Sequence, residues 1–342
     1  MIRAGIFNVT GYMGAEAARL LHGHPEIDLV SVTGRSEAGK PLGEVFPHLE
    51  PLGLTVAEEL AEVDAVVSAL PHAAAAERLL PYIERGLPVL DLSADFRLRR
   101  VEEYETWYGP HPAAKLLSKA VMGIPELHRE ELADAKLVGS AGCHSTASIL
   151  ALAPALKAGL IEPDIIIDSK TGISGAGRSL GLSYHYPEAN EGVSAYALGG
   201  HRQLPEMTQE LGALWEAPDP TITFVPHLAP MTRGIFVTAY ATLRGDADLG
   251  SDPTAGVREL YSRFYAEAPF VRVPAEPPAT KQTLGSNQCL VFPTIDERSR
   301  RLIVVSCLDN LIKGGAGQGV QCLNLMLGLP EEAGLTGLAL YP

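Results

Sequence analysis

Residues 2–14 read IRAGIFNVTGYMG, and this stretch decides the fold. Its first half is an apolar run typical of a strand, and the helical pattern of residues 14–22 follows it directly. The glycines Gly5, Gly11 and Gly14 have the spacing of a turn that lets the backbone approach a pyrophosphate, whose charge the start of a helix stabilises. Asn8 stands where the strict motif would place another glycine, so a purely structural turn is the alternative. Because the turn follows the first strand, it favours a dinucleotide site.

The end of the second predicted strand indicates which dinucleotide is bound. It reads Thr33-Gly34-Arg35-Ser36. Enzymes that use NAD usually carry Asp or Glu at this point to bind the ribose hydroxyls. Arg35 and Ser36 instead supply a positive charge and a hydrogen-bond donor, which suit a 2′-phosphate. NADP(H) is therefore the expected cofactor, and a solvated surface arginine is the alternative interpretation of Arg35.

Short apolar runs alternate with helical patterns through the first 140 residues. The pattern predicts helices at residues 14–22 and 73–84, and strands at residues 2–9, 27–33, 65–70, 89–92 and 137–139. Strand–helix alternation at this spacing is typical of an α/β domain with a Rossmann-type, doubly wound parallel sheet.

After residue 143 the pattern changes to longer strands with few crossover helices. It predicts helices at 146–158, 203–214 and 254–266, and strands at 165–169, 221–225, 235–243 and 302–307. These indicate an α+β catalytic and oligomerisation domain with a mixed, largely antiparallel sheet. The glycine-rich and then helical segment 314–327 is expected to return to the first domain. The predicted organisation is an NADP-binding Rossmann domain of residues 1–142 plus 310–342, and a catalytic and dimerisation domain of residues 143–309.

The composition is that of an ordinary globular protein and limits the partners. The chain has 342 residues, of which 46% are hydrophobic and 20% charged, with a formal net charge of −14. This charge argues against nucleic acid and anionic membranes as partners. No run approaches the ~20 apolar residues of a membrane span. The first residues lack a signal-peptide layout and the four cysteines lack C-x-x-C spacing, so a reduced, cytoplasmic location is expected.

One cysteine has the context of a nucleophile. Cys143 follows a glycine turn and precedes a predicted helix, and the start of a helix lowers a thiol pKa and so favours the thiolate. Backbone N–H groups at such a position can also hold a developing oxyanion. The other three cysteines, Cys289, Cys307 and Cys322, lie in apolar strand-like or helical segments, for which a buried structural role is expected.

The motifs that follow one another along the chain resemble those of the N-acetyl-gamma-glutamyl-phosphate reductase family, the arginine-biosynthesis branch of the semialdehyde dehydrogenase superfamily. The resemblance covers nearly the whole chain. It is carried by Thr10-Gly11-Tyr12 with Gly14, Leu70-Pro71-His72, Asp91-Leu92-Ser93-Ala94-Asp95-Phe96-Arg97, Gly142-Cys143, the run from Lys170 to Arg178, Gly199-Gly200-His201-Arg202, the run from Pro226 to Gly234, and the run from Asp309 to Gly314.

The resemblance implies a chemical mechanism. Cys143 attacks an acyl phosphate, here N-acetyl-L-glutamyl 5-phosphate, and the resulting thioester is reduced with NADPH to N-acetyl-L-glutamate 5-semialdehyde. His201 matches the family's acid–base histidine. The small-molecule acyl phosphate is the expected partner, within a homodimer or homotetramer formed through the second domain.

The resemblance also implies the remaining site residues, none of which is a metal ligand. The expected substrate-binding residues are Arg97, Lys170, Arg178, Arg202 and Glu206, because an anionic substrate needs cationic clamps and Arg suits bidentate oxyanions. Arg233 belongs to the same set of cations within motifs. The expected cofactor-binding residues are Gly5, Thr10, Gly11, Tyr12, Gly14, Arg35, Ser36, Pro71, Ser93, Ser174, Gly175, Asn310 and Gln318.

The chain departs from the family's pattern around the catalytic residues. Ser140-Ala141 and His144-Ser145 flank Gly142-Cys143 where the family usually has Asn-Pro and Tyr-Pro, and Gln203 replaces a second histidine. His144 is a candidate to perturb the neighbouring thiol. These departures leave the chemistry intact and bear on substrate specificity. The alternative activities are a lysine-biosynthesis reductase acting on carrier-linked 2-aminoadipate 6-phosphate and an aspartate-semialdehyde dehydrogenase. A catalytically inactive nucleotide-binding regulator is the alternative from another class, and it would be expected to lack Cys143 or His201, both of which are present.

Overall fold

The computed structural model describes residues 1–215 and 219–342, and the chain divides into two compact units. Unit 1 contains residues 1–142 and 315–337, and unit 2 contains residues 143–314 and 338–342. In the part of the chain that is described, no helix has the length and apolarity to cross a membrane.

Unit 1 is built on a seven-stranded sheet in which every pair of neighbours is parallel. The strand order is β3-β2-β1-β4-β5-β7-β6, so the chain runs outward in one direction from β1 to β3 and then returns to β4 beside β1. The strands are β1 (Ile2–Phe7), β2 (Ile27–Thr33), β3 (Val56–Ala57), β4 (Ala65–Ser68), β5 (Val89–Asp91), β6 (Val121–Gly123) and β7 (Leu137–Ser140). Such a reversal creates a crevice at the carboxyl ends of β1 and β4, where ligands of doubly wound sheets bind.

Helices cover this sheet, and its strands are apolar because they are buried on both faces. Ile6, Val66 and Leu90 have no exposed surface. Helix α10 packs beside both α1 and α5, so the segment near the C-terminus completes the fold of unit 1. The helices are α1 (Tyr12–His22), α2 (Leu42–Val45), α3 (Ala75–Glu84), α4 (Val101–Tyr108), α5 (Pro125–Ala133) and α10 (Gly317–Met326), with 3-10 segments at Pro47–Leu52 and Ala114–Lys119.

Unit 2 contains a second seven-stranded sheet of mixed direction, ordered β12-β13-β14-β11-β8-β10-β9. Most neighbours are antiparallel, whereas β8 pairs with β10 and β12 with β13 in parallel. The strands are β8 (Ile161–Thr171), β9 (Ser194–Ala195), β10 (Thr221–Leu228), β11 (Ile235–Leu243), β12 (Val271–Arg272), β13 (Cys289–Asp296) and β14 (Arg301–Leu308). Buried and partly exposed residues alternate along β11 and β13, as expected of a sheet with one covered face.

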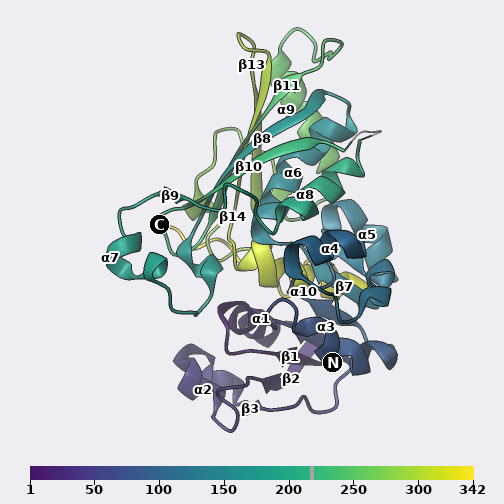
Figure 1. Cartoon of the computed structure of the whole chain (residues 1–342), viewed down its shortest axis with the longest axis vertical. Helices are drawn as coiled ribbons and strands as arrows, with labels where there is room; N and C mark the ends of the chain where they lie inside the picture. The colour runs from purple at the N-terminus through teal and green to yellow at the C-terminus, as the bar shows by residue number, and fades with distance from the viewer. Residues whose placement is uncertain (216–218) are drawn as a thin grey trace. The chain divides into compact units, whose positions relative to one another are not determined.

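Helix α6 (Cys143–Lys157) lies at the centre of unit 2. It packs against β8, β11, β13 and β14 and against α8 (Leu204–Gly212) and α9 (Pro253–Phe264), and Figure 1 shows it alongside the long strands. Every residue from His144 to Leu156 is buried, because the helix is apolar on all sides. Only its first residue, Cys143, is partly exposed at one end and its last, Lys157, exposed at the other.

The predicted fold class, a Rossmann-type sheet followed by a mixed, largely antiparallel sheet, is confirmed. The pattern missed β13, in which Pro293 interrupts the alternation, and it missed β6 and the helices α4 and α5, whose short or charged sequences carry weak periodicity. It also began α6 at Thr146, whereas the helix begins at Cys143 itself. Before α10 the chain forms a π-helical turn at Ile312–Ala316, and a short helix α7 (Tyr186–Ala189) precedes β9.

Candidate active site

The turn between β1 and α1 has the geometry that a pyrophosphate requires. Asn8 adopts a left-handed backbone with φ of 61°, which Asn tolerates better than most residues, and its side-chain amide donates to Ala69 O at 2.8 Å. A Cβ atom on Gly14 would lie 2.4 Å from Asn8 O, so only glycine fits there. Among the described residues no side chain caps the start of α1, and its first N–H groups therefore suit an anion.

Other predicted cofactor residues lie at the same edge of the sheet in unit 1. Arg35 and Ser36 are exposed immediately after β2, and Pro71 is exposed after β4. Thr10 packs on Gly34, where a Cβ atom would lie 2.5 Å from the threonine methyl. Tyr12, the first residue of α1, is 38% exposed. Gly5 has another reason to be glycine, because it packs within β1 against Leu60.

The motif from Asp91 to Arg97 ties the end of β5 to the start of α3. Asp95 accepts the N–H groups of Ala73, Ala75 and Ala76 and the hydroxyl of Tyr104. Ser93 is buried and donates its hydroxyl to Asp91, whose pKa burial raises to about 6. Arg97 is also buried and donates to Leu92 O at 2.8 Å. Most of these polar groups hold the loop itself together. Gln318 is fully buried in α10.

In unit 2, the side chain of Gln203 caps the helix that begins with Cys143. Its Oε1 accepts the N–H of His144 at 3.0 Å and that of Ser145 at 3.2 Å. The hydroxyl of Ser145 donates back to Gln203 O at 3.3 Å. The residue that replaces the family's second histidine is thus the cap of α6. The N–H groups behind the thiol are bonded to this cap, so the sequence-based expectation that they hold an oxyanion is not met by His144 and Ser145.

A close backbone approach fixes the position of Cys143. A Cβ atom on Gly314 would lie 2.6 Å from Cys143 Cβ and 3.1 Å from its Cα. Gly314 is itself held by an N–H···O bond of 2.9 Å to Asp309 O. The other cysteines are buried, and burial raises the pKa of the Cys307 thiol. Of the four cysteines, all of which lie in the described part of the chain, only Cys143 is partly exposed.

His201 is held next to this helix start with a defined ring orientation. Its Nδ1 accepts the backbone N–H of Gln203 at 3.2 Å, which places the ring proton on Nε2 in the neutral form. The ring lies 5.3 Å from that of His144 and 5.4 Å from that of Phe224, between centroids. Burial, and secondarily Arg202, lower the pKa of His201 to about 4. At neutral pH this histidine is an uncharged donor through Nε2.

His144 is fully enclosed, and both of its ring nitrogens have partners. Nδ1 lies 2.7 Å from Ser169 Oγ and Nε2 lies 3.1 Å from the hydroxyl of Tyr196. Burial, and secondarily His201, lower the pKa of His144 to about 3. Tyr196 and Ser169 were not among the predicted site residues. The alternation along β8 points Ile165, Ile167 and Ser169 to the same face, which is the signal that could have identified Ser169.

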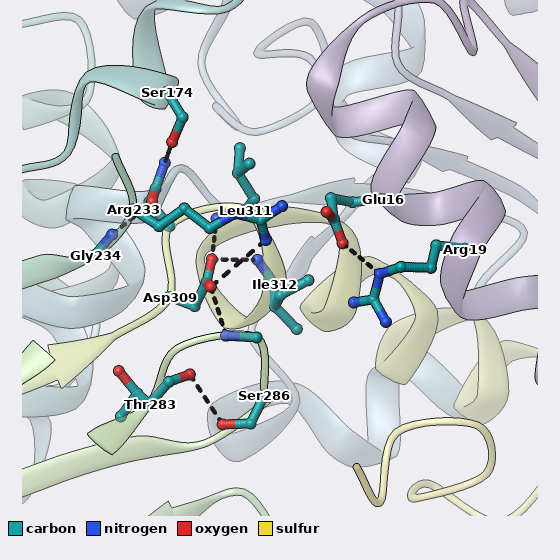
Figure 2. A network of polar contacts seen from close by, with 12 residues as sticks. Glu16, Arg19, Ser174, Arg233, Gly234, Thr283, Ser286, Asp309, Leu311 and Ile312 are labelled. Carbon is teal, nitrogen blue, oxygen red and sulfur yellow. Dashed lines mark hydrogen bonds and ion pairs between the residues drawn. The ribbon is translucent and has the colours of Figure 1, made fainter. Parts of the chain in front are cut away.

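A polar network next to β14 contains two of the predicted cofactor residues (Figure 2). Asn310 donates to Ser174 Oγ at 3.0 Å and accepts Gly234 N–H at 2.8 Å. Buried Asp309 lies 3.6 Å from the guanidinium of Arg233, and it accepts the N–H groups of Leu311 and Gly285, each at 2.8 Å. This network fixes the turn that leads into Gly314. Gly175 is exposed beside it.

The predicted substrate cations differ in their surroundings. Arg178 and Arg202 are exposed, Lys170 forms a 2.8 Å ion pair with Asp168, and Glu206 is almost fully buried at the start of α8. Arg97 belongs to the other unit. The structure thus brings Cys143, His201 and Gln203 together, and leaves the two exposed arginines open to solvent.

Comparison with known proteins assigns the family of the chain. Residues 3–135 match the model of the semialdehyde dehydrogenase NAD binding domain, and residues 143–310 match that of the semialdehyde dehydrogenase dimerisation domain. A relative from Dehalococcoides mccartyi named N-acetyl-gamma-glutamyl-phosphate reductase is 48% identical over 342 residues, which cover 99% of each chain. The chain belongs to this reductase family. Relatives with the same name from Geotalea daltonii and Geobacter metallireducens are each 46% identical to this chain. The alignments cover 100% of both chains.

Solved structures of more distant proteins share the fold. Aspartate semialdehyde dehydrogenase II from Vibrio cholerae, complexed with ASA, is similar with a TM-score of 0.69 at 16% identity, covering 96% of this chain and 98% of its own. The Candida albicans aspartate semialdehyde dehydrogenase with NADP gives 0.69 at 17% identity and the same coverage. At 16–17% identity these structures show the fold alone. The relatives at 46–48% identity favour the reductase over the aspartate-semialdehyde dehydrogenase and carrier-linked alternatives.

The contact between Gly314 and Cys143 predicts a sensitive position. Gly314→Ala should lower kcat by about 10-fold or more, because the added methyl must push the nucleophile out of place and small misplacements cost large factors in rate. Gly245→Ala, where a Cβ atom would meet nothing within 4 Å, serves as the control. Steady-state kinetics of both variants check this, and equal kcat values would contradict the geometry.

The two neutral histidines predict a pH-dependent stability. Their folded pKa values lie below the ordinary value near 6.5, so the unfolded chain binds more protons between pH 6.5 and 4, and the free energy of unfolding must fall as the pH falls through this window. His144→Phe should reduce the slope by about 1.4 kcal/mol per pH unit. Urea unfolding at several pH values measures it, and an unchanged slope in His144→Phe would contradict the assignment.

Proposed function

We propose that the chain reduces N-acetyl-L-glutamyl 5-phosphate to N-acetyl-L-glutamate 5-semialdehyde and phosphate with NADPH, through a thioester on Cys143. The observation that carries the proposal is a partly exposed cysteine at the first position of a buried helix, linked through one residue to a neutral histidine. Gln203 makes both links, with its side chain to α6 and its backbone N–H to His201. The family relatives carry the name of this reaction.

The positive end of α6 favours the thiolate of Cys143. The thiolate sulfur attacks the acyl carbon, the carbon–oxygen bond to phosphate breaks, and phosphate leaves with the bonding pair and takes up one proton. NADPH, when bound, supplies the hydride that reduces the thioester carbon. The resulting oxyanion collapses to the aldehyde and returns the electron pair to sulfur, so the thiolate is regenerated and no further proton is consumed.

His201 serves in this proposal as a hydrogen-bond donor. Since Nδ1 accepts from Gln203, the ring offers an N–H at Nε2 and no basic nitrogen on that side. A lowered pKa keeps the imidazole uncharged at neutral pH. This replaces the acid–base role that the resemblance implied with a donor role towards the oxygen of the acyl group, where negative charge develops.

Unit 1 is the proposed NADP-binding domain and unit 2 the proposed catalytic domain. The helix start at Gly11 to Gly14, which no side chain caps among the described residues, suits the pyrophosphate, and Arg35 with Ser36 suits the 2′-phosphate. The Asn310–Ser174 pair is proposed to border the nicotinamide. Arg178 and Arg202 are the proposed anion clamps for the substrate, with Lys170 partly neutralised by Asp168.

The half-exposed face of the unit 2 sheet is the proposed dimer interface. It carries Ile166, which is 41% exposed, together with the partly exposed Phe236 and Tyr240 on the neighbouring strand. An apolar sheet face of this kind fits a second copy of the chain, and the matched family model is a dimerisation domain. A cytoplasmic location agrees with the free cysteines.

The cofactor assignment predicts the effect of removing one charge. Arg35→Ala should lower kcat/KM for NADPH by about 10- to 100-fold, since a hydrogen bond to a charged group is worth about 1.5–3 kcal/mol, and should leave NADH almost unaffected. Exposed Arg298→Ala is the control. A wild-type preference for NADH would contradict the assignment.

The reaction itself is tested in the oxidative direction. Wild-type enzyme should reduce NADP⁺ with N-acetylglutamate semialdehyde only when phosphate is present, because phosphate must release the acyl group from sulfur. Cys143→Ser should reduce turnover by at least about 10³-fold, whereas Cys322→Ser should not change kcat by more than about threefold. Turnover on carrier-linked aminoadipyl phosphate that exceeds turnover on N-acetylglutamyl phosphate would overturn the substrate assignment.

A further inference from the structure

Resting on the proposed function, we propose that Tyr196 donates its hydroxyl hydrogen to the negative charge that forms at Cys143, and that His144 and Ser169 are the positioning residues that aim it. Tyr196 and His201 would then form a side-chain oxyanion site. The proposal involves residues that the motifs did not identify. Tyr196 and Ser169 were not predicted site residues, and His144 is a position where the chain departs from its family's pattern.

The first step is that the site needs donors other than the helix backbone. The N–H groups of His144 and Ser145 are bonded to Gln203 Oε1. These two N–H groups are therefore engaged, and a buried oxyanion next to Cys143 gains from donors on other side chains, because buried charge without donors is costly. His201 Nε2 supplies one N–H by the tautomer argument above.

The second step places Tyr196 beside the nucleophile. Its hydroxyl lies 3.1 Å from Nε2 of His144, the residue that follows Cys143, and its ring centroid lies 5.7 Å from that of His201. From residue 191 to 200 every side chain except that of Tyr196 is exposed. Ala197 next to it has φ of 49°, a strained value for alanine. The segment 191–200 thus partly buries one side chain, that of Tyr196. Burial and the charge of Cys143 both raise the pKa of Tyr196, which keeps its phenol protonated.

The third step sets the direction of the hydrogen bonds. Ser169 Oγ is fully buried, and His144 Nδ1 is the only partner recorded for it among residues 1–215 and 219–342. Buried hydroxyls generally donate where an acceptor is within reach, and we therefore assign Ser169 as the donor to Nδ1. The neutral ring of His144 then carries its proton on Nε2 and donates to the oxygen of Tyr196. The hydrogen of Tyr196 is left to point away from His144, towards the reacting group.

The test is a double-mutant cycle on the full-length enzyme with two readouts. Tyr196→Phe should lower kcat by about 100-fold with KM changed by less than about threefold, as expected for a donor that acts in the transition state. In Ser169→Ala, Nδ1 of His144 is free to carry the ring proton, and Nε2 then accepts the hydrogen of the Tyr196 hydroxyl. That hydrogen no longer points towards the reacting group, so kcat should fall about 10-fold. The double variant should be no slower than Tyr196→Phe alone. Exposed Tyr341→Phe is the matched control.

The second readout needs no substrate. The pH dependence of iodoacetamide alkylation reports the thiol pKa of Cys143, which should rise by about one unit in Tyr196→Phe and in Ser169→Ala but not in Tyr341→Phe. His144→Gln, whose amide can still donate to Tyr196, should recover part of the activity that His144→Phe loses. Additive effects in the cycle, or an unchanged thiol pKa in both variants, would overturn the inference. Absence of wild-type turnover would instead refute the proposed function. The alkylation result would still decide the inference about Tyr196.

Discussion

The bond from Gln203 to the start of α6 is the constraint on which the active site depends. One amide oxygen holds the two N–H groups behind the nucleophile, and the backbone of the same residue holds His201. The position of the histidine relative to the helix is therefore set by a single residue. This arrangement also engages those two N–H groups, which is why we propose side-chain donors for the oxyanion.

Burial explains why these donors remain uncharged. Helix α6 is enclosed on all sides, and the rings of His144 and His201 lie against Phe224. Such surroundings disfavour an imidazolium and lower the pKa values of both histidines. A neutral imidazole offers one donor and one acceptor, and its orientation is decided by its neighbours. Gln203 and Ser169 thus determine which nitrogen of His201 and of His144 carries the proton. The burial that stabilises unit 2 also keeps both imidazoles uncharged.

The sequence was most informative where chemistry and local geometry coincide. The glycine turn at Gly14 and the cysteine at the start of a helix could be predicted, because each needs a particular residue at one chain position. Apolar periodicity predicted both sheets, and β2 and β11 have the predicted bounds. Strand β13 was not predicted because Pro293 interrupts its otherwise ordinary alternation of apolar and polar residues. Short β6 and charged α5 lack a strong pattern, and only packing within unit 1 decides them.

The pairs that join distant segments could not be predicted. Ser169 meets His144 across 25 positions, and Gln203 reaches Ser145 across 58. No local pattern encodes such contacts, so Gln203 was noticed only as a departure from the family and Tyr196 was not noticed at all. The motif from Asp91 to Arg97 gives the reverse lesson, since its polar residues mainly support a loop: Asp95 holds the start of α3 and Ser93 binds Asp91.

The central claim is that a single sulfur atom carries the acyl group between two chemical steps. Intact-mass and peptide mass spectrometry of enzyme mixed with N-acetylglutamyl phosphate in the absence of NADPH tests this most directly. The account predicts one N-acetylglutamyl adduct on Cys143 that disappears when NADPH is added. An adduct on another side chain, or none on an enzyme that turns over normally, would contradict it.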